Sequence, residues 1–144
     1  MGLAPVRSYE IYDIASRIRS ALPAWKMPKK ADKDARIDHL FDYLQKELGG
    51  YPMKKRAEAG GVLADLVVSE EVAIEFQHNL STPAQLKSLM ERLKGLKMWP
   101  GIIIVILTGK VSDKLRSKLD DFANGLNNDR WYSSVKEIVT MKKV

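Results

Sequence analysis

Apolar residues recur at helical spacing in four stretches of the chain. The four stretches are Ser8–Leu22, Asp34–Leu48, Thr82–Leu96 and Ser112–Gly125. Within each stretch the apolar positions are three or four residues apart, which gives the predicted helix one apolar face. Pro23 and the pair Gly49-Gly50 are typical signals for the end of the first two helices. Thr82-Pro83-Ala84-Gln85 is a typical helix start, with a capping threonine and a glutamine three residues later.

Three short segments between the second and third helices are typical of β-strands. They are Pro52–Ala59, Val62–Val68 and Val72–Gln77, separated by Gly60-Gly61 and by Ser69-Glu70-Glu71. "GIIIVILTG", from Gly101 to Gly109, is apolar throughout, as expected of a central strand that is covered on both faces. A last short strand, "VKEIVTM", follows the fourth helix. This order predicts an α/β fold with a mixed central sheet flanked by helices.

Composition narrows the class of protein. The 144 residues include 45% hydrophobic and 29% charged residues, a balance that favours a single folded domain. Cysteine is absent, which excludes disulfides and thiolate metal sites, and two histidines are too few for a histidine-rich zinc site. No apolar run approaches the roughly 20 residues of a membrane span. Charged residues from Arg7 onward do not fit a signal peptide. We therefore expect an intracellular, cytoplasmic protein without a membrane partner.

The chain is basic, with a net charge of +6 and a pI near 9.5. The basic residues gather at Lys26–Lys33, Lys54–Arg56, Lys87–Lys97 and Lys110–Lys118. Such an excess serves solubility, and it also favours attraction to a polyanion such as nucleic acid. The glycine pairs lack the spacing of a phosphate-binding loop, so nothing supports nucleotide hydrolysis.

Three polar residues interrupt the apolar strands: Asp65, Glu75 and Gln77. Because strand side chains alternate between faces, Glu75 and Gln77 share one face. A tight turn centred on Glu70 would place Asp65 directly opposite Glu75, with Cβ atoms about 4.5–5.5 Å apart. Two carboxylates this close repel, and a divalent cation such as Mg²⁺ would remove the conflict.

The alternative is that Asp65 and Glu75 lie on a solvated sheet face or at a sheet edge, opposite nothing important. Many antiparallel sheets have one such face. Leu63 and Val67 share the face of Asp65 and indicate that it is covered. The pattern therefore leaves a metal site and a wet sheet face as competing interpretations.

The stretch "ADLVV", a three-residue turn and "VAIEFQ" resembles the core of the PD-(D/E)XK nuclease superfamily. The order of helix, three strands, helix and strand from Asp34 to Leu107 is similar to that family's core. More narrowly, "IEFQHN" followed by "STPAQL" resembles CoiA-like competence nucleases and restriction enzymes of the BglII type. The resemblance implies a single nuclease-like domain over 1–144: an N-terminal helix at 8–22, a core at about 34–107 and a C-terminal extension at 108–144.

The resemblance further implies hydrolysis of DNA phosphodiester bonds with Mg²⁺, or Mn²⁺ in its place, held by Asp65 and Glu75. Gln77 stands where the family carries lysine, so it would orient the attacking water or mark a weak or inactive domain that serves in binding DNA or a protein. An acidic residue of the first core helix should complete the site. Asp38 is the best match, with Asp34, Asp42 and Glu47 as alternatives.

Six basic residues flank the predicted site and could neutralise DNA phosphates. They are Lys54, Lys55 and Arg56 on the first strand, and Lys87, Arg92 and Lys94 on the following helix. Each could equally be a solvated surface charge. DNA is the expected partner. A homodimer is also considered, because a chain of this size covers little DNA.

Overall fold

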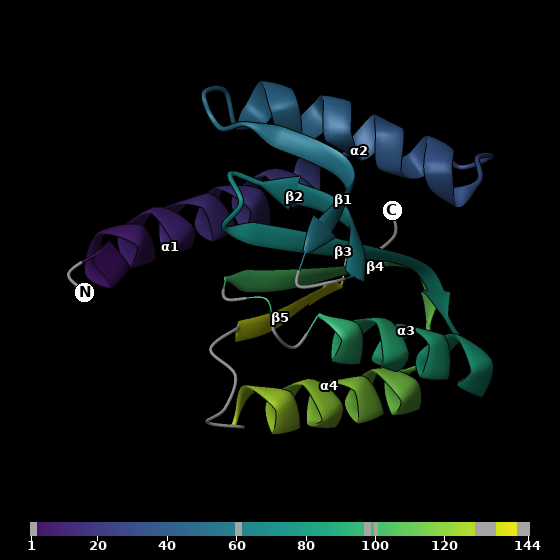
Figure 1. The fold of residues 1–144 in the computed structure, drawn as a ribbon. Helices are drawn as coiled ribbons and strands as arrows, with labels where there is room; N and C mark the ends of the chain where they lie inside the picture. The colour runs from purple at the N-terminus through teal and green to yellow at the C-terminus, as the bar shows by residue number, and fades with distance from the viewer. Residues whose placement is uncertain (1–2, 60–61, 97–98, 100, 129–134, 141–144) are drawn as a thin grey trace.

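A five-stranded sheet with helices on both faces organises the chain (Figure 1). The computed structural model describes residues 3–59, 62–96, 99, 101–128 and 135–140. The elements are α1 (Leu3–Ala21), a short 3-10 turn η1 (Leu22–Ala24), α2 (Lys33–Glu47), β1 (Met53–Ala59), β2 (Val62–Val68), β3 (Val72–Leu80), α3 (Pro83–Gly95), β4 (Ile102–Val111), α4 (Asp113–Asn127) and β5 (Val135–Thr140). The predicted element order is confirmed.

The strands lie in the order β1-β2-β3-β4-β5. The β1–β2 and β2–β3 pairs are antiparallel, whereas the β3–β4 and β4–β5 pairs are parallel. The sheet is therefore mixed, as the sequence predicts. Short turns connect the antiparallel strands, and each parallel connection passes through a helix, as parallel pairing requires.

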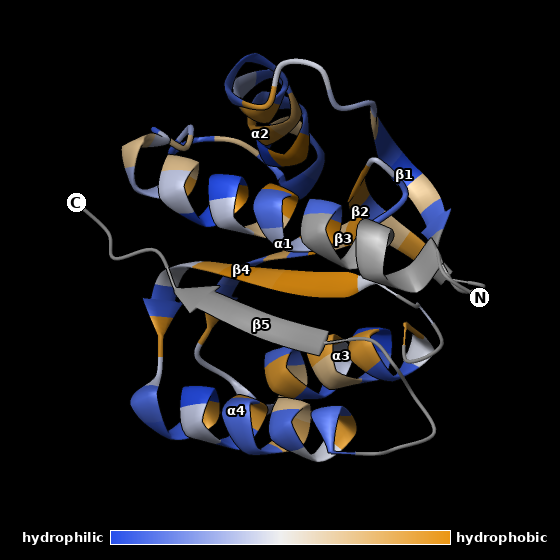
Figure 2. Ribbon diagram, turned by 90° about the vertical axis from the view of Figure 1, so that its left-hand side faces the viewer, coloured by the Kyte–Doolittle hydropathy of each residue, from blue (hydrophilic) through white to orange (hydrophobic). Residues whose placement is uncertain are grey.

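The two faces of the sheet bury separate apolar clusters. Helices α1 and α2 pack on the face that carries Leu66, Ile74 and Phe76, and helices α3 and α4 cover the face that carries Val67 and Ala73. In Figure 2, β4 is hydrophobic along most of its length and lies between these two layers. Its residues Ile102 to Leu107 are all at most 2% exposed. The continuous apolar run of β4 thus follows from burial on both faces.

Helix ends follow local capping chemistry. At α3 the Thr82 hydroxyl accepts the Gln85 N–H and the Gln85 side chain accepts the Thr82 N–H, which confirms the predicted start. Helix α2 begins at Lys33 because Asp32 caps it, accepting the Ala35 N–H at 2.8 Å.

Two helices are longer than predicted. Helix α1 begins at Leu3 rather than at Ser8, since Pro5 falls in its first turn, where the missing N–H of proline costs no hydrogen bond. Helix α4 continues past Gly125 to Asn127, because one glycine costs only about 1 kcal/mol in a helix and Leu126 packs against the core.

Strand β3 runs to Leu80, three residues beyond its predicted end at Gln77. Its pairing with β4 shifts between His78 and Leu80, where Asn79 has a φ of 73°. The Asn79 side chain accepts the Lys110 N–H at 2.8 Å and so bridges the irregularity. Among the described residues, no helix is both long and apolar enough to cross a bilayer.

Candidate functional site

The β2–β3 hairpin has the register predicted from a turn centred on Glu70. Val68 pairs with Val72 and Leu66 pairs with Ile74. Ser69 and Glu70 both have positive φ angles, and the Glu71 N–H donates to the Val68 carbonyl at 3.0 Å. The next residues outward from the Leu66–Ile74 pair are Asp65 and Glu75. Asp65 and Glu75 therefore lie close together, as the predicted turn requires.

Each carboxylate accepts a hydrogen bond from a backbone N–H of the neighbouring strand. The Asp65 N–H donates to Glu75 Oε2 at 3.2 Å, and the Phe76 N–H donates to Asp65 Oδ2 at 2.8 Å. These side-chain bonds continue the connection between β2 and β3 beyond the last Leu66–Ile74 backbone pair. The Asp65 side chain is 14% exposed and that of Glu75 is 1% exposed. The pair is therefore covered, which does not fit the alternative of a solvated face.

One part of the sequence argument for that cover is wrong. Val67 is buried, as predicted, but Leu63 is 66% exposed. Leu63 is the second residue of β2, opposite Glu58 and next to the Ala59–Val62 pair that precedes the β1–β2 turn. Helix α3 packs on this face of the sheet, and one of its side chains contacts both carboxylates.

That side chain is Arg92, which the sequence placed among the DNA-binding residues. Its Nη1 donates to Glu75 Oε1 at 3.0 Å and lies 3.9 Å from Asp65 Oδ2, so one nitrogen faces both carboxylates. Its Nη2 donates to the Gln77 Oε1 atom at 2.5 Å. From the opposite side, Lys33 Nζ lies 3.5 Å from Asp65 Oδ1. Arginine and lysine thus supply the positive charge that the two carboxylates need.

Burial dominates the electrostatics of the pair. Burial is the main cause, and the neighbouring Asp65 carboxylate the second, of a rise in the pKa of the Glu75 carboxyl from 4.5 to about 7. Arg92 acts in the opposite direction and favours the charged form of Glu75. Carboxyl groups whose pKa is shifted by burial and by neighbouring charges are more frequent at functional sites than elsewhere.

The donor atoms of the pair suit magnesium by type, since Mg²⁺ prefers carboxylate oxygens. In the observed arrangement, however, all four carboxylate oxygens already face a donor: Lys33, the Phe76 N–H, Arg92 and the Asp65 N–H. The described residues contain no group of three acidic or histidine side chains that could hold a metal ion. A metal ion could therefore use Asp65 and Glu75 only after Arg92 had moved off Glu75.

Gln77 is bound at both ends of its amide. Its Nε2 donates to the Asn79 carbonyl at 2.8 Å while its Oε1 accepts from Arg92. Lysine at this position could not accept a hydrogen bond and would repel Arg92. Glutamine at position 77 is therefore matched to the arginine, and its predicted role in orienting water stays a prediction.

Asp38 does not join the pair, contrary to the sequence expectation. Its carboxylate is half exposed and forms ion pairs with Lys55 at 3.2 Å and with Arg56 at 3.3 Å. The hydrogen bond from Lys55 is the main cause of the lowered pKa of Asp38. Asp34 also pairs with Arg56, at 3.3 Å. These ion pairs hold α2 to β1 and engage the carboxylates that were expected at the site.

The backbone at Arg56 explains this pairing. Strand alternation would place Arg56 on the same face as Lys54, but its φ of 48° is left-handed. The β1–β2 ladder keeps its register here, but Arg56 and Asp65 do not pair between the Lys55–Leu66 and Ala57–Ala64 pairs. As a result Arg56 and its neighbour Lys55 both reach Asp38 on α2.

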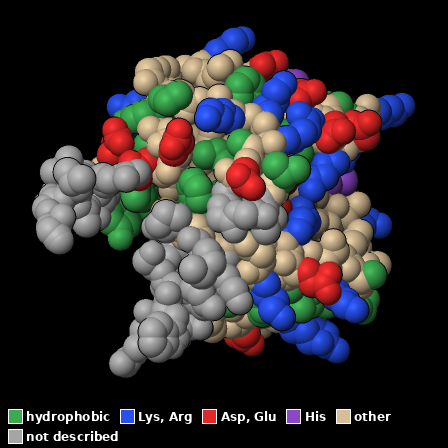
Figure 3. All heavy atoms as spheres, in the orientation of Figure 1, with side chains coloured by type: hydrophobic (Ala, Val, Ile, Leu, Met, Phe, Trp, Pro, Cys, Tyr) green, Lys and Arg blue, Asp and Glu red, His purple; other side chains and the backbone are tan. Residues whose placement is uncertain are grey.

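The other predicted DNA-binding residues lie at the surface. Lys87 and Lys94 are exposed on α3, and the side chain of Lys54 is 66% exposed, 4.0 Å from the Glu70 carboxylate. In Figure 3, Lys and Arg side chains are frequent on the side where α2 begins and β3 ends, mixed with acidic ones. On the described part of the face shown in Figure 3, basic side chains therefore lie among acidic ones.

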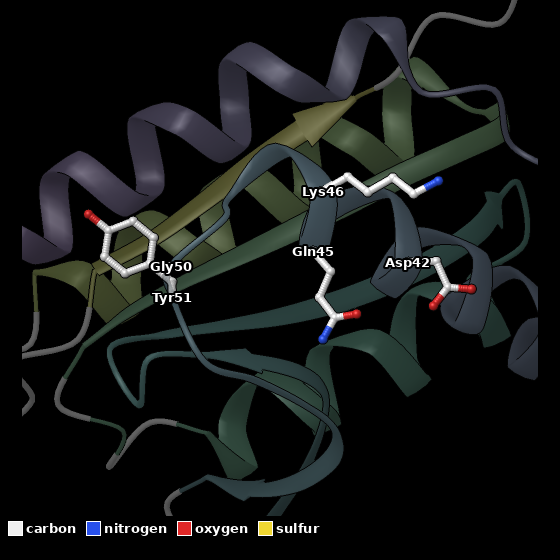
Figure 4. A pocket seen from close by; sticks show the side chains of 5 residues that line it. All are labelled: Asp42, Gln45, Lys46, Gly50 and Tyr51. Carbon is white, nitrogen blue, oxygen red and sulfur yellow. The ribbon is translucent and has the colours of Figure 1, made fainter.

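A surface hollow lies away from the carboxylate pair. It has a volume of about 510 Å³ and is lined by Asp42, Gln45, Lys46, Gly50 and Tyr51 near the end of α2. Its side chains point in different directions and do not converge on a common point (Figure 4). Asp42, an alternative for the acidic residue of the site, thus faces this open depression, and Glu47 is exposed to solvent.

Sequence reasoning missed the role of Arg92 and the contribution of Lys33. A signal for Arg92 exists in the helix pattern, because Arg92 follows the buried Leu89 by three residues and directly precedes the buried Leu93. An arginine at the border of a buried helix face can extend to solvent or form a partly buried ion pair, and Arg92 forms the ion pair. Lys33 directly follows the helix cap Asp32, and no sequence signal connects it with Asp65.

No family model, no curated protein and no solved structure matches the chain. The resemblance to PD-(D/E)XK nucleases therefore depends on the residues and the element order given above, and the family stays a prediction.

Proposed function

We propose that the chain is a nuclease-like domain that hydrolyses phosphodiester bonds in DNA with the help of a divalent cation. The proposal is carried by the Asp65–Glu75 pair: two carboxyl groups on neighbouring strands, one only 1% exposed, whose proximity raises the pKa of Glu75. The order of helix, three strands, helix and strand around the pair supports the same assignment.

In this proposal Asp65 and Glu75 would hold Mg²⁺ or Mn²⁺. A bound divalent cation lowers the pKa of a coordinated water and stabilises negative charge that develops on a phosphoryl group. Arg92 and Lys33 lie next to the pair and are suited to contact phosphate oxygens, and the exposed Lys87 and Lys94 extend the positive charge along α3. DNA is therefore the proposed partner.

The test is nicking of supercoiled plasmid by purified protein with Mg²⁺ or Mn²⁺, compared among wild type, Asp65→Asn and Glu75→Gln. These substitutions remove charge but keep an oxygen that can accept the Phe76 or Asp65 N–H, so the hairpin should be retained. Glu91→Gln, an exposed neighbour on α3, is the matched control. We expect both site variants to lose cleavage and the control to keep it. Wild-type rates in Asp65→Asn or Glu75→Gln would refute the assignment.

A second function is favoured by a specific observation, the pairing of all four carboxylate oxygens with donors of the protein itself. In this alternative the domain binds DNA, or a protein, through its basic surface and has little or no catalysis. It predicts DNA affinity that weakens as salt rises, no heat of Mn²⁺ binding in calorimetry, and no nicking at high protein concentration. A homodimer stays a prediction, which light scattering would test.

A further inference from the structure

The guanidinium of Arg92 lies close enough to both carboxylates to stabilise their negative charge. Its Nη1 is 3.0 Å from Glu75 Oε1 and 3.9 Å from Asp65 Oδ2. A divalent cation bound by the same pair would also have to lie close to these two oxygens. Two cations at such short separation repel strongly in a buried site, since little solvent screens them.

We infer that Arg92 is an internal counter-ion that competes with the divalent cation for Asp65 and Glu75. The inference rests on the proposed metal-binding function. It assigns two states to the site: one in which Arg92 binds Glu75, and one in which a metal ion binds the pair and Arg92 has moved away.

Gln77 stabilises the arginine-bound state. Its Oε1 accepts from Nη2 of Arg92, and its own Nε2 is held by the Asn79 carbonyl at 2.8 Å. The amide is thereby oriented with its oxygen toward Arg92. An acceptor at position 77 and an arginine at position 92 thus form one unit, which a lysine at position 77 would disrupt by repulsion.

Other features of Arg92 favour its release. The side chain is 25% exposed, so the guanidinium has a path toward solvent. Its Nε is buried and has no hydrogen-bond partner among the described residues, which is a cost of the arginine-bound state. Once away from Glu75, the guanidinium could bind a phosphate oxygen of the substrate in a bidentate manner. Phosphodiester and metal ion would then favour the same state of the site.

The experiment measures Mn²⁺ affinity by calorimetry in wild type, Arg92→Gln and the charge-matched control Lys118→Gln, an exposed residue of α4. Removal of the competing charge should raise Mn²⁺ affinity about tenfold or more in Arg92→Gln. Lys118→Gln also removes one positive charge, but its affinity should stay close to that of wild type because the charge is solvated.

A second variant covers the case in which Arg92→Gln does not fold. Gln77→Met keeps the length of the side chain but removes the acceptor for Arg92, so it should raise Mn²⁺ affinity to a smaller extent. Equal affinities in wild type and both variants would overturn the competition while metal binding stands. Absence of Mn²⁺ binding in all folded proteins would overturn the competition together with the proposed metal-dependent function.

Discussion

Replacement of Glu75 by glutamine should change how the stability of the protein depends on pH. Burial raises the pKa of Glu75 from 4.5 to about 7, so between these values the folded state binds a proton that the unfolded state releases. Proton binding to Glu75 in the folded state therefore raises the free energy of unfolding at low pH relative to that at higher pH. This contribution to stability is fully present below pH 4.5 and is lost as pH rises to about 7.

The size of the effect follows from the same pKa values. A change from 4.5 to about 7 corresponds to about 3 kcal/mol in the free energy of unfolding. Little of this is screened by solvent, because the Glu75 side chain is 1% exposed. Glutamine is neutral throughout and can still accept the Asp65 N–H. The free energy of unfolding of Glu75→Gln should therefore gain about 3 kcal/mol relative to wild type between pH 4.5 and pH 7.5.

The measurement is urea unfolding of both proteins at several pH values in buffer with a metal chelator. His78 contributes with the opposite sign, because burial lowers its pKa and charging it at low pH destabilises the fold. Since both proteins contain His78, its contribution cancels in the difference between the two curves. Glu91→Gln, a solvated carboxylate, should follow wild type. Parallel curves for wild type and Glu75→Gln would refute the reasoning.

Three further predictions concern other parts of the molecule. Asp38→Asn should leave plasmid nicking unchanged, because the Asp38 carboxylate is engaged by β1 and not by the carboxylate pair; loss of nicking in a folded variant would contradict this. Gly101→Ala should lower the free energy of unfolding by about 2–4 kcal/mol, because a Cβ at this position would lie 1.8 Å from the Glu71 carbonyl oxygen. Gly125→Ala is the control: a Cβ there would have no atom within 4 Å, so this change should be neutral or stabilise the protein by up to about 1 kcal/mol. Thermal or urea unfolding decides between these outcomes. Lys87→Gln and Lys94→Gln should each reduce the slope of log DNA affinity against log salt by about 1 if these exposed residues contact phosphates, and fluorescence anisotropy would show unchanged slopes if they do not.

The sequence predicted the fold well where local rules decide it. The Thr82–Gln85 capping box, the apolar run of β4 and the turn centred on Glu70 all depend on residues that are close in the chain. The turn also determined the register, since a hairpin of fixed turn length allows only one pairing. The proximity of Asp65 and Glu75 followed from that register alone.

Features that depend on tertiary contacts could not be predicted in this way. The left-handed φ of Arg56 directs it to Asp34 and Asp38, and no residue preference indicates that conformation for an arginine. Arg92 is seventeen residues from Glu75, and only the packing of α3 on the sheet brings their side chains together. Sequence reasoning recognised that the two carboxylates need a positive charge, but the structure supplies it from the protein itself.

The central claim is that Asp65 and Glu75 form a metal-binding pair for which Arg92 is the competing cation. The most direct measurement is a crystal structure of the protein grown with Mn²⁺ and a short DNA duplex, with anomalous scattering used to locate the metal. We predict an anomalous peak in contact with carboxylate oxygens of Asp65 and Glu75, and an Arg92 guanidinium that has left Glu75. An Arg92 still bound to Glu75, with no Mn²⁺ at the pair, would contradict the account.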